Sequence, residues 1–171
     1  MSLTARHQVV AFYGVPTVTT TGTGNTVTTT YRRMKNFTQL SKAKNPQEYN
    51  RKYVDEATQR TDVTGYATQY DYAFDRDPDD PVLADIMRIT DRELIGDDAI
   101  RSIISVDVVT GAAFKRDFAV IPGSEGSDAN IYTYSGSFKA HGEAVAGTAA
   151  SNDDFQTVTF TEEAAATTTT P

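Results

Sequence analysis

The sequence predicts a mainly β protein, an antiparallel β-sandwich or open barrel with one flanking α-helix. Segments in which apolar and polar residues alternate occur before and after a single helical pattern, and glycines lie at expected turns between them. This order of strands, one helix and more strands favours antiparallel layers with a helix packed against them. The chain has 171 residues, of which 39% are hydrophobic and 23% charged, so it is long enough to bury one sizeable core.

The first segment with a clear pattern, residues 17–30, is rich in threonine, which suits strands, and contains glycines, which suit turns. It predicts either a hairpin that turns through residues 22–25 or a mobile arm that becomes ordered on assembly. We expect residues 1–30 to form this N-terminal arm or hairpin and residues 31–163 to form the main domain. Residues 164–171 are low in complexity and predict a flexible tail.

Two strands are predicted between this segment and the helix. Residues 31–40 have the composition of a mixed strand. In residues 63–74, aromatic residues and threonine occupy every second position, and small or polar residues fill the positions between them. One aromatic face and one small, polar face are typical of a sheet that is covered on one side.

The helix is predicted at residues 81–90. Asp80 suits its N-cap, Pro81 suits its first position, and the charge of Asp79 complements the positive end of the helix dipole. Gly96 is expected to end the unit. The apolar stripe that would face the core consists of Val82, Leu83, Ile86, Met87 and Ile89.

Four further strands are predicted after the helix, at residues 100–108, 114–120, 131–142 and 155–161. Apolar and polar residues alternate in the first of them, and Gly111 is expected to turn the chain into the second. No internal repeat is evident, so we expect these strands to complete the same domain.

Charge and composition exclude several kinds of site. The net charge is −7 and the pI about 4.7, so the surface repels phosphate and tight nucleic-acid binding is not expected. There are no cysteines, which excludes disulfides, thiolate metal sites and thiol nucleophiles. No apolar run is long enough to span a bilayer and no signal peptide is recognised, so we expect a soluble protein made in a cytosol.

Few residues are candidates for catalysis. The two histidines, His7 and His141, are expected to be surface or strand residues rather than parts of a shared site. Residues 75–80 have acids at alternate positions, like the start of a calcium-binding loop, but Asp80 stands where that loop needs glycine and Ile86 where it needs glutamate. We favour a turn followed by a capped helix. The sequence therefore predicts no catalytic, cofactor-binding or metal-binding residue and no enzymatic activity.

The most distinctive segment is a polar block at residues 42–56. It is too charged to be core, and it is rich in tyrosine and arginine, the residue types that are enriched where interfaces concentrate their energy. On composition alone, an arm that contacts a partner and a solvated loop are both open interpretations.

An ordered set of four segments is found at residues 45–56 (NPQEYNRKYVDE), 61–72 (TDVTGYATQYDY), 115–122 (KRDFAVIP) and 132–138 (YTYSGSF). Together these segments resemble bacteriophage tail tube proteins, also called major tail proteins, of tailed phages and prophages of Gram-positive bacteria. The resemblance covers roughly residues 31–163, and the N-terminal threonine-rich segment lies outside it.

The resemblance implies a β-sandwich with one helix, six copies of which form a ring whose inner sheets join around a lumen. Rings would stack into the hollow tube that conducts DNA from the capsid to the host. It implies a place in the virion, after assembly in the bacterial cytoplasm, and no membrane. The implied partners are copies of the chain and other tail proteins: the tape measure, the tail terminator, the distal tail or baseplate initiator and, in contractile tails, the sheath. DNA would pass through the lumen without specific binding, which suits the acidic charge.

The same resemblance gives the polar block a role. Residues 40–60 would form an arm that reaches a neighbouring subunit or ring. The candidate interface residues of this arm are Tyr49, Arg51, Tyr53 and Asp55.

Two alternatives to a tube subunit stay open. One is a carbohydrate- or receptor-binding β-sandwich module of a tail tip or cell surface. The chain has no tryptophan, the usual platform for stacking on sugars, although its nine tyrosines could substitute. The other is a hydrolase, whose activity would depend on His7, His141 or Asp128.

Overall fold

The computed structural model describes residues 3–164 of the chain, so the predicted C-terminal tail lies outside the described residues except for Ala164. The helices in this part are η1 (Arg6–Gln8), α1 (Pro81–Asp91) and η2 (Gly96–Ala99). The strands are β1 (Val9–Thr21), β2 (Gly24–Arg33), β3 (Phe37–Ala43), β4 (Pro46–Arg51), β5 (Arg60–Tyr66), β6 (Gln69–Asp75), β7 (Ile100–Asp107), β8 (Ala112–Glu125), β9 (Thr133–Ala140), β10 (Val145–Ala150) and β11 (Thr157–Glu162).

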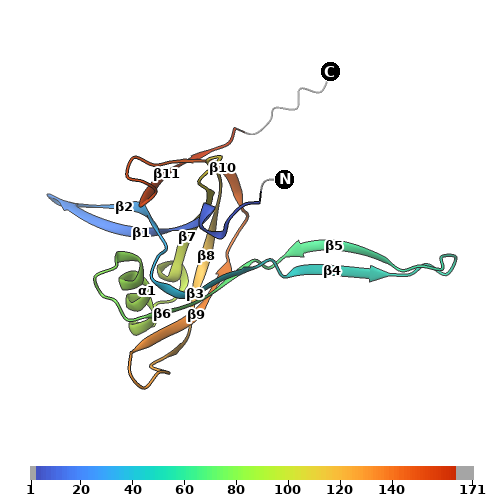
Figure 1. Cartoon of the computed structure of the whole chain (residues 1–171), viewed down its shortest axis with the longest axis horizontal. Coiled ribbons are helices and arrows are strands. Elements are labelled where there is room, and N and C mark those ends of the chain that lie inside the picture. The colour runs from blue at the N-terminus through green and yellow to red at the C-terminus, as the bar shows by residue number, and fades with distance from the viewer. Residues whose placement is uncertain (1–2, 165–171) are drawn as a thin grey trace.

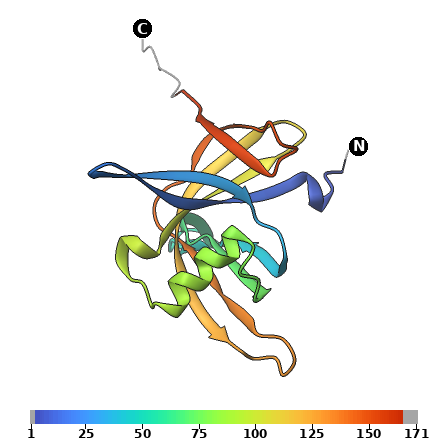
Figure 2. The ribbon, with the colours of Figure 1, turned by 90° about the vertical axis from the view of Figure 1, so that its left-hand side faces the viewer.

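Nine of these strands form one antiparallel sheet in the order β10-β11-β2-β1-β7-β8-β9-β6-β3. Because β10 also pairs with β8, the sheet closes on itself, and β8, β7, β1, β2, β11 and β10 form a barrel. β9, β6 and β3 continue the sheet beyond β8 as an open extension (Figures 1 and 2). The predicted mainly β, antiparallel fold with one α-helix is thus confirmed for the described residues, and the open-barrel prediction corresponds to a barrel with an extension.

Apolar side chains are buried in two clusters. The first lies where α1 packs on the sheet, and it includes Leu83 of the helix and Tyr13 and Phe74 of the strands. The second is formed by side chains of β1, β7, β8, β10 and β11, with Phe12 and Ile104 fully buried. Since Phe12 and Tyr13 are neighbours in one strand, their side chains point to opposite faces. β1 therefore contributes to both clusters, as β7 does through Ile103 and Ile104.

The helix begins where the sequence predicts. A carboxylate oxygen of Asp80 accepts a hydrogen bond from the backbone N–H of Val82 at 2.9 Å, which caps the helix. α1 ends at Asp91, one residue beyond the predicted limit, and Glu93 then adopts a left-handed φ of 51°. Gly96 opens η2 instead of ending the helix. No helix in the described part of the chain is long and apolar enough to cross a membrane.

Two predicted strands are each broken in the structure. The prediction at residues 31–40 spans the end of β2 and the start of β3, which are separated because Asn36 adopts a left-handed φ of 63°. The prediction at residues 63–74 spans the end of β5 and all but the last residue of β6. Aromatic residues and threonine occur at every second position on both sides of the break, so the sequence pattern does not reveal it. Tyr66 in β5 is 58% exposed, whereas Tyr72 in β6 is buried.

After the helix, the predicted strands correspond to β7, β8, β9 and β11 with shifted ends, and β10 is not predicted. β10 is composed of small residues, so its sequence carries no apolar alternation. A Cβ on Gly147 would lie 2.2 Å from the carbonyl oxygen of Thr161 in β11. The close approach of the two backbones therefore requires glycine at this position.

The threonine-rich segment is a hairpin of β1 and β2, paired as far as Thr21 and Gly24, with Gly22 at a φ of 63° in the turn. The hairpin alternative is the one that the structure contains. β1 pairs with β7 only through Val9–Tyr13, and the rest of the hairpin projects from the body (Figures 1 and 2). The predicted boundary at residue 30 therefore does not coincide with a break in the sheet.

Candidate functional site

The arm, defined here as residues 46–66 with strands β4 and β5, projects from the body of the molecule (Figure 1). β4 and β5 pair only with each other, in a separate sheet of two strands. At the base, the Asn45 side chain donates to the carbonyl oxygen of Ala67, and the N–H of Ala67 donates to the carbonyl oxygen of Asn45, both at 3.1 Å. The predicted arm is therefore a hairpin. Its limits are displaced from the predicted residues 40–60 because β3 includes the start of that range.

One face of the arm carries a ladder of tyrosine and arginine side chains. The guanidinium of Arg51 lies over the rings of Tyr49 and Tyr53, at 5.7 and 5.5 Å from their centroids. The guanidinium of Arg60, the first residue of β5, lies 5.6 Å from the centroid of the Tyr53 ring. Cation–π attraction holds these long side chains together. A partner that binds the ladder therefore meets side chains that are already ordered, which lowers the entropy cost of binding.

Acidic side chains neutralise the ladder. A carboxylate oxygen of Asp62 lies 3.1 Å from Nη2 of Arg51, and Glu56 forms an ion pair with Arg60. Both pairs are exposed to solvent, and such pairs contribute about 0–1 kcal/mol to stability. These two ion pairs therefore contribute little to the stability of the arm, and their main effect is to neutralise the two arginines.

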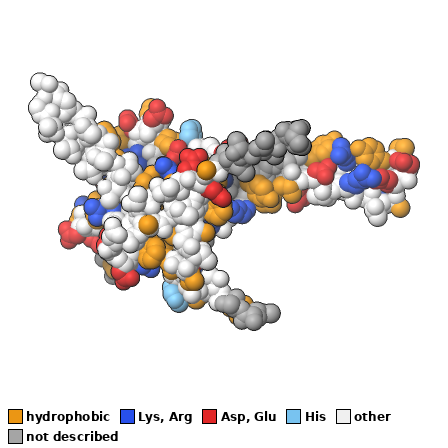
Figure 3. Space-filling model, turned by 90° about the horizontal axis from the view of Figure 1, so that it is seen from above, with side chains coloured by type: hydrophobic (Ala, Val, Ile, Leu, Met, Phe, Trp, Pro, Cys, Tyr) orange, Lys and Arg blue, Asp and Glu red, His pale blue; other side chains and the backbone are white. Residues whose placement is uncertain are grey.

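The arm exposes apolar and aromatic surface to solvent. Tyr49, Tyr53, Val63 and Tyr66 are each 44–58% exposed, and Val54 is fully exposed. Hydrophobic side chains are visible along the arm beside its charged groups (Figure 3). Because an isolated two-stranded hairpin is marginally stable in water, burial of these side chains against a partner would stabilise both the arm and the contact.

The structure brings three of the four predicted interface residues together. Tyr49 and Arg51 of β4 and Tyr53, two residues beyond this strand, form the ladder, whereas Asp55, further along the connection to β5, takes no part in it. Their contact with a partner stays a prediction. The sequence analysis misses Arg60, whose place opposite Arg51 follows from the register of the hairpin.

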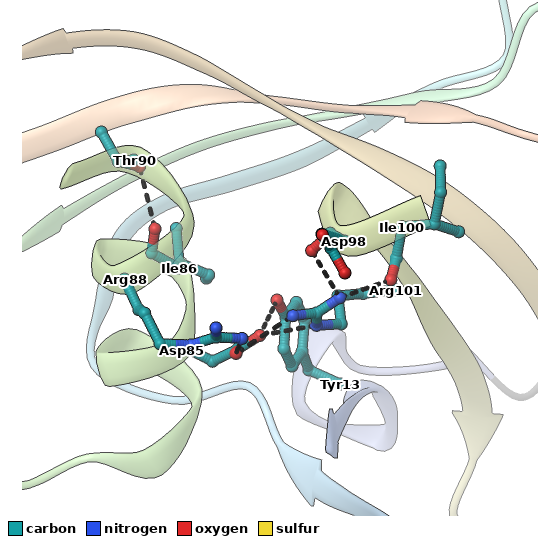
Figure 4. Close-up of polar contacts among 8 residues, drawn as sticks. All are labelled: Tyr13, Asp85, Ile86, Arg88, Thr90, Asp98, Ile100 and Arg101. Carbon is teal, nitrogen blue, oxygen red and sulfur yellow. Dashed lines mark hydrogen bonds and ion pairs between the residues drawn. The ribbon is translucent and has the colours of Figure 1, made fainter. Parts of the chain in front are cut away.

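A cluster of charged and polar groups lies between α1 and the sheet, with Asp85 and Arg101 buried (Figure 4). Asp85 accepts hydrogen bonds from the Tyr13 hydroxyl and from Nε of Arg101, both at 2.7 Å, and from Nη2 of Arg88 at 3.0 Å. Nη1 of Arg101 donates to two backbone carbonyl oxygens at 3.0 and 2.7 Å. We call this cluster the clamp, since it ties α1 to β1 and β7.

In the clamp, the pKa values of Asp85 and Tyr13 are both moved further away from neutral pH. Burial alone would raise the pKa of Asp85, but hydrogen bonds from Arg101, Tyr13 and Arg88 outweigh it, so this pKa is lowered. Burial, followed by the negative charge of Asp85, raises the pKa of Tyr13 well above its usual value. The carboxylate stays ionised and the hydroxyl stays protonated, which suits a structural role.

The residues named for a hydrolase lie on different elements. His7 is in η1 and His141 follows β9, and both are exposed. Asp128 lies in the loop between β8 and β9, where the backbone N–H groups of Asn130 and Ile131 donate to it and lower its pKa. This aspartate is engaged in shaping its own turn.

The segment that mimics a calcium loop is a turn followed by a capped helix, as favoured from the sequence. Asp77 accepts a hydrogen bond from the N–H of Asp79, and Asp80 caps α1. Within residues 3–164, no three His, Cys, Asp or Glu side chains are grouped in a way that could hold a metal ion.

Comparison with known proteins gives remote structural likenesses alone, and one of them is described here. No family model matches the chain, and no curated protein matches it. A chain in a structure described as the cryo-EM structure of the anti-feeding prophage (AFP) baseplate, 6-fold symmetrised, is similar to this one with a TM-score of 0.42 and 7% sequence identity. The similarity covers 85% of this chain and 96% of that chain. A likeness this remote carries no conclusion about what this chain does.

Proposed function

We propose that the protein is the structural subunit of a phage tail tube, which assembles with copies of itself into hexameric rings that stack into a hollow, DNA-conducting tube. The observation that carries the proposal is the arm. It extends from the body, pairs only with itself and exposes an ordered ladder around Arg51. A surface of this kind is costly to maintain in a monomer and useful in an assembly, because Tyr and Arg dominate the energy of interfaces.

The edges of the main sheet also support self-assembly. Among the described strands, β3 pairs only with β6, so its outer edge has backbone N–H and C=O groups without strand partners. The outer part of β1, beyond Tyr13, likewise has one unpaired edge. Unpaired edges favour association with other strands. In a closed ring, neighbouring copies would pair them.

The charge of the protein suits a conduit for DNA. A net charge of −7 makes the average surface repel phosphate, so DNA would slide past it instead of binding. The subunit would act without catalysis, inside the virion, in contact with the tape measure and with the proteins at the two ends of the tube.

The first test is negative-stain electron microscopy of the purified protein, dilute and concentrated. We expect hollow particles of uniform diameter that lengthen with concentration. The matched variant replaces residues 46–66 with an Asn-Gly turn, because β3 and β6 are antiparallel neighbours that a tight turn can connect. This variant should keep the body folded and form no stacked tubes.

Dispersed small particles of wild-type protein at every concentration, with or without the isolated tail-tip initiator, would contradict the proposal. They would favour the carbohydrate- or receptor-binding module instead. Tubes formed equally well by the variant without the arm would contradict the role assigned to the arm.

A further inference from the structure

A cationic groove lies beside the base of the arm. Two adjoining cavities of about 400 and 230 Å³ share Lys42, Tyr70 and Ser105 in their walls, and together they form this groove. The positively charged residues that line it are Arg6, Lys42, Lys44 and Arg116, and its lining contains no Asp or Glu. A groove whose charged residues are all positive is unexpected in a protein with a net charge of −7.

None of these four cations forms an ion pair within the described residues, where the ion-paired cations are arginines of the arm and of the clamp. Arg116 donates to the carbonyl oxygen of Gly142 and to the Thr68 hydroxyl, both neutral acceptors. The Lys42 ammonium lies 5.3 Å from the centroid of the Tyr70 ring. Loss of solvation, and then the charges of Lys44 and Arg116, lower the pKa of Lys42. Like charges held this close would be stabilised by a bound anionic group.

The wall of the groove includes an open strand edge. Leu40, Ser41 and Lys42 are consecutive residues of β3, and all three line the larger cavity. Consecutive strand residues point to opposite faces, so the edge of the strand, and not only one face, borders the groove. This edge is the unpaired one of β3. The groove therefore offers backbone hydrogen bonds as well as positive charge, which suits a polypeptide better than a small anion.

The other end of the same sheet is acidic. β6 runs from Tyr70 at the groove to Asp75, a distance of roughly 17 Å for an extended strand. Beyond Asp75 the chain continues into a loop with Asp77 and Asp79, and Glu125 of β8 lies opposite Tyr134 at this end of the extension. Arg76 is the one cation of this loop. Each copy of the molecule thus carries a positive end and a negative end along one strand.

We infer that the groove binds the acidic loop, residues 75–79, of a second copy of the chain. The contact joins different surfaces of the two copies, so it is a head-to-tail contact that repeats along a ring or a stack. It deepens the proposed function, on which it rests, by naming a contact other than the arm. Charge complementarity selects the partner, and the free edge of β3 fixes its direction.

Cross-linking tests the contact directly, because the natural chain has no cysteine. Ser41→Cys places a thiol at the groove and Pro78→Cys places one in the acidic loop, and both positions are exposed. We expect an oxidised mixture of the two variants to give a band at twice the mass of the 18.7 kDa chain. Neither variant alone should give this band, since a head-to-tail contact does not place two identical positions together.

One rival acidic segment is η2, and Asp97→Cys provides its probe. Cross-linking of Ser41→Cys to Asp97→Cys in preference to Pro78→Cys would overturn the inference. So would the absence of any mixed product above that of Ser41→Cys with a Thr23→Cys control, placed at the exposed tip of the β1–β2 hairpin.

A charge exchange gives an independent readout. Lys42→Glu with Lys44→Glu, or Asp77→Lys with Asp79→Lys, should each weaken self-association at least tenfold in sedimentation velocity, and all four changes together should restore it. Lys35→Glu, on an exposed loop, controls for altered net charge. Failure of the fourfold variant to exceed both double variants would overturn the inference.

The two proposals fail in distinguishable ways. Wild-type tubes without the mixed cross-link would leave the tube proposal standing and remove the groove contact. A mixed cross-link in a protein that forms only short oligomers, with no tubes under any condition, would support the groove contact and remove the tube.

Discussion

Two of the hairpins that project from the body, β1–β2 and the arm, differ in how they are attached and in what they expose. The β1–β2 hairpin begins inside the body, where Phe12 and Tyr13 are buried, and only its outer part leaves the sheet. That part is formed mainly by threonine, and its projection in Figure 3 carries almost no charged side chains. The arm, by contrast, pairs only with itself and carries the ladder around Arg51.

The difference separates residues that stabilise the fold from residues that are available to partners. Where one end of a strand is buried in the core, as in β1, the core holds the projecting part of the strand in place. A hairpin that is held only at its base depends on whatever it binds. Substitutions in the buried end should therefore change stability most, and substitutions in the arm should hardly change it.

Phe12→Ala should have the largest effect, because it empties a fully buried site in the barrel. We expect a loss of about 3–5 kcal/mol in the free energy of unfolding, measured by chemical denaturation. Val18→Ala, in the same strand but 60% exposed on the projecting part, is the control and should change it by about 0.5 kcal/mol or less. Equal effects would show that the projection is part of the core.

Asp85→Ala should destabilise the protein by about 3–5 kcal/mol, because it leaves the buried guanidinium of Arg101 without its carboxylate. Arg88→Ala removes an exposed partner of the same carboxylate, so it should cost about 1 kcal/mol or less. Similar losses for the two variants would argue that the clamp does not depend on the buried pair.

The pH dependence of stability should reflect the ionisation of the Asp85 carboxylate. The pKa of Asp85 is lowered in the folded protein, so its contribution is fully present above the ordinary value of 3.8 and is lost as the pH falls through the folded pKa. The difference in unfolding free energy between wild type and Asp85→Asn should be constant above about pH 5 and shrink below about pH 4. A difference that grows on acidification would contradict this sign.

Arg51→Glu should have almost no effect on the folded monomer, because its ion pair and its ring contacts are exposed. We expect a change of about 0.5 kcal/mol or less in unfolding free energy, but loss of stacked tubes in electron microscopy. Asp55→Lys, outside the ladder, should impair stacking less. Normal tubes from both variants would mean that the ladder is not an assembly contact.

The sequence predicts local features well where a single residue determines them. Asp80 caps α1 as expected, because its carboxylate can reach the free backbone N–H groups of the first turn. The alternation around Tyr66 and Tyr72 does not reveal the break between arm and body, since the exposed and buried aromatics have the same spacing. β10 lacks an apolar pattern, and its pairing with β8 depends on contacts far along the chain.

The candidate site is predicted in part for the same physical reason. Tyr49 and Arg51 lie two residues apart in β4, so their shared face follows from strand geometry, and Tyr53 follows two residues beyond the strand. Arg60 joins them only through the register of the hairpin. The clamp and the cationic groove consist of side chains from several elements that are far apart in the sequence, so no local spacing predicts them.

Hydrogen exchange of the arm, measured by mass spectrometry in dilute and in assembled protein, tests the central claim most directly. We expect the amides of residues 46–66 to exchange rapidly in the monomer and to become protected in tubes, while those of α1 stay protected in both. Arm amides that exchange as fast in assembled tubes as in the monomer would contradict the role of the arm as the stacking contact.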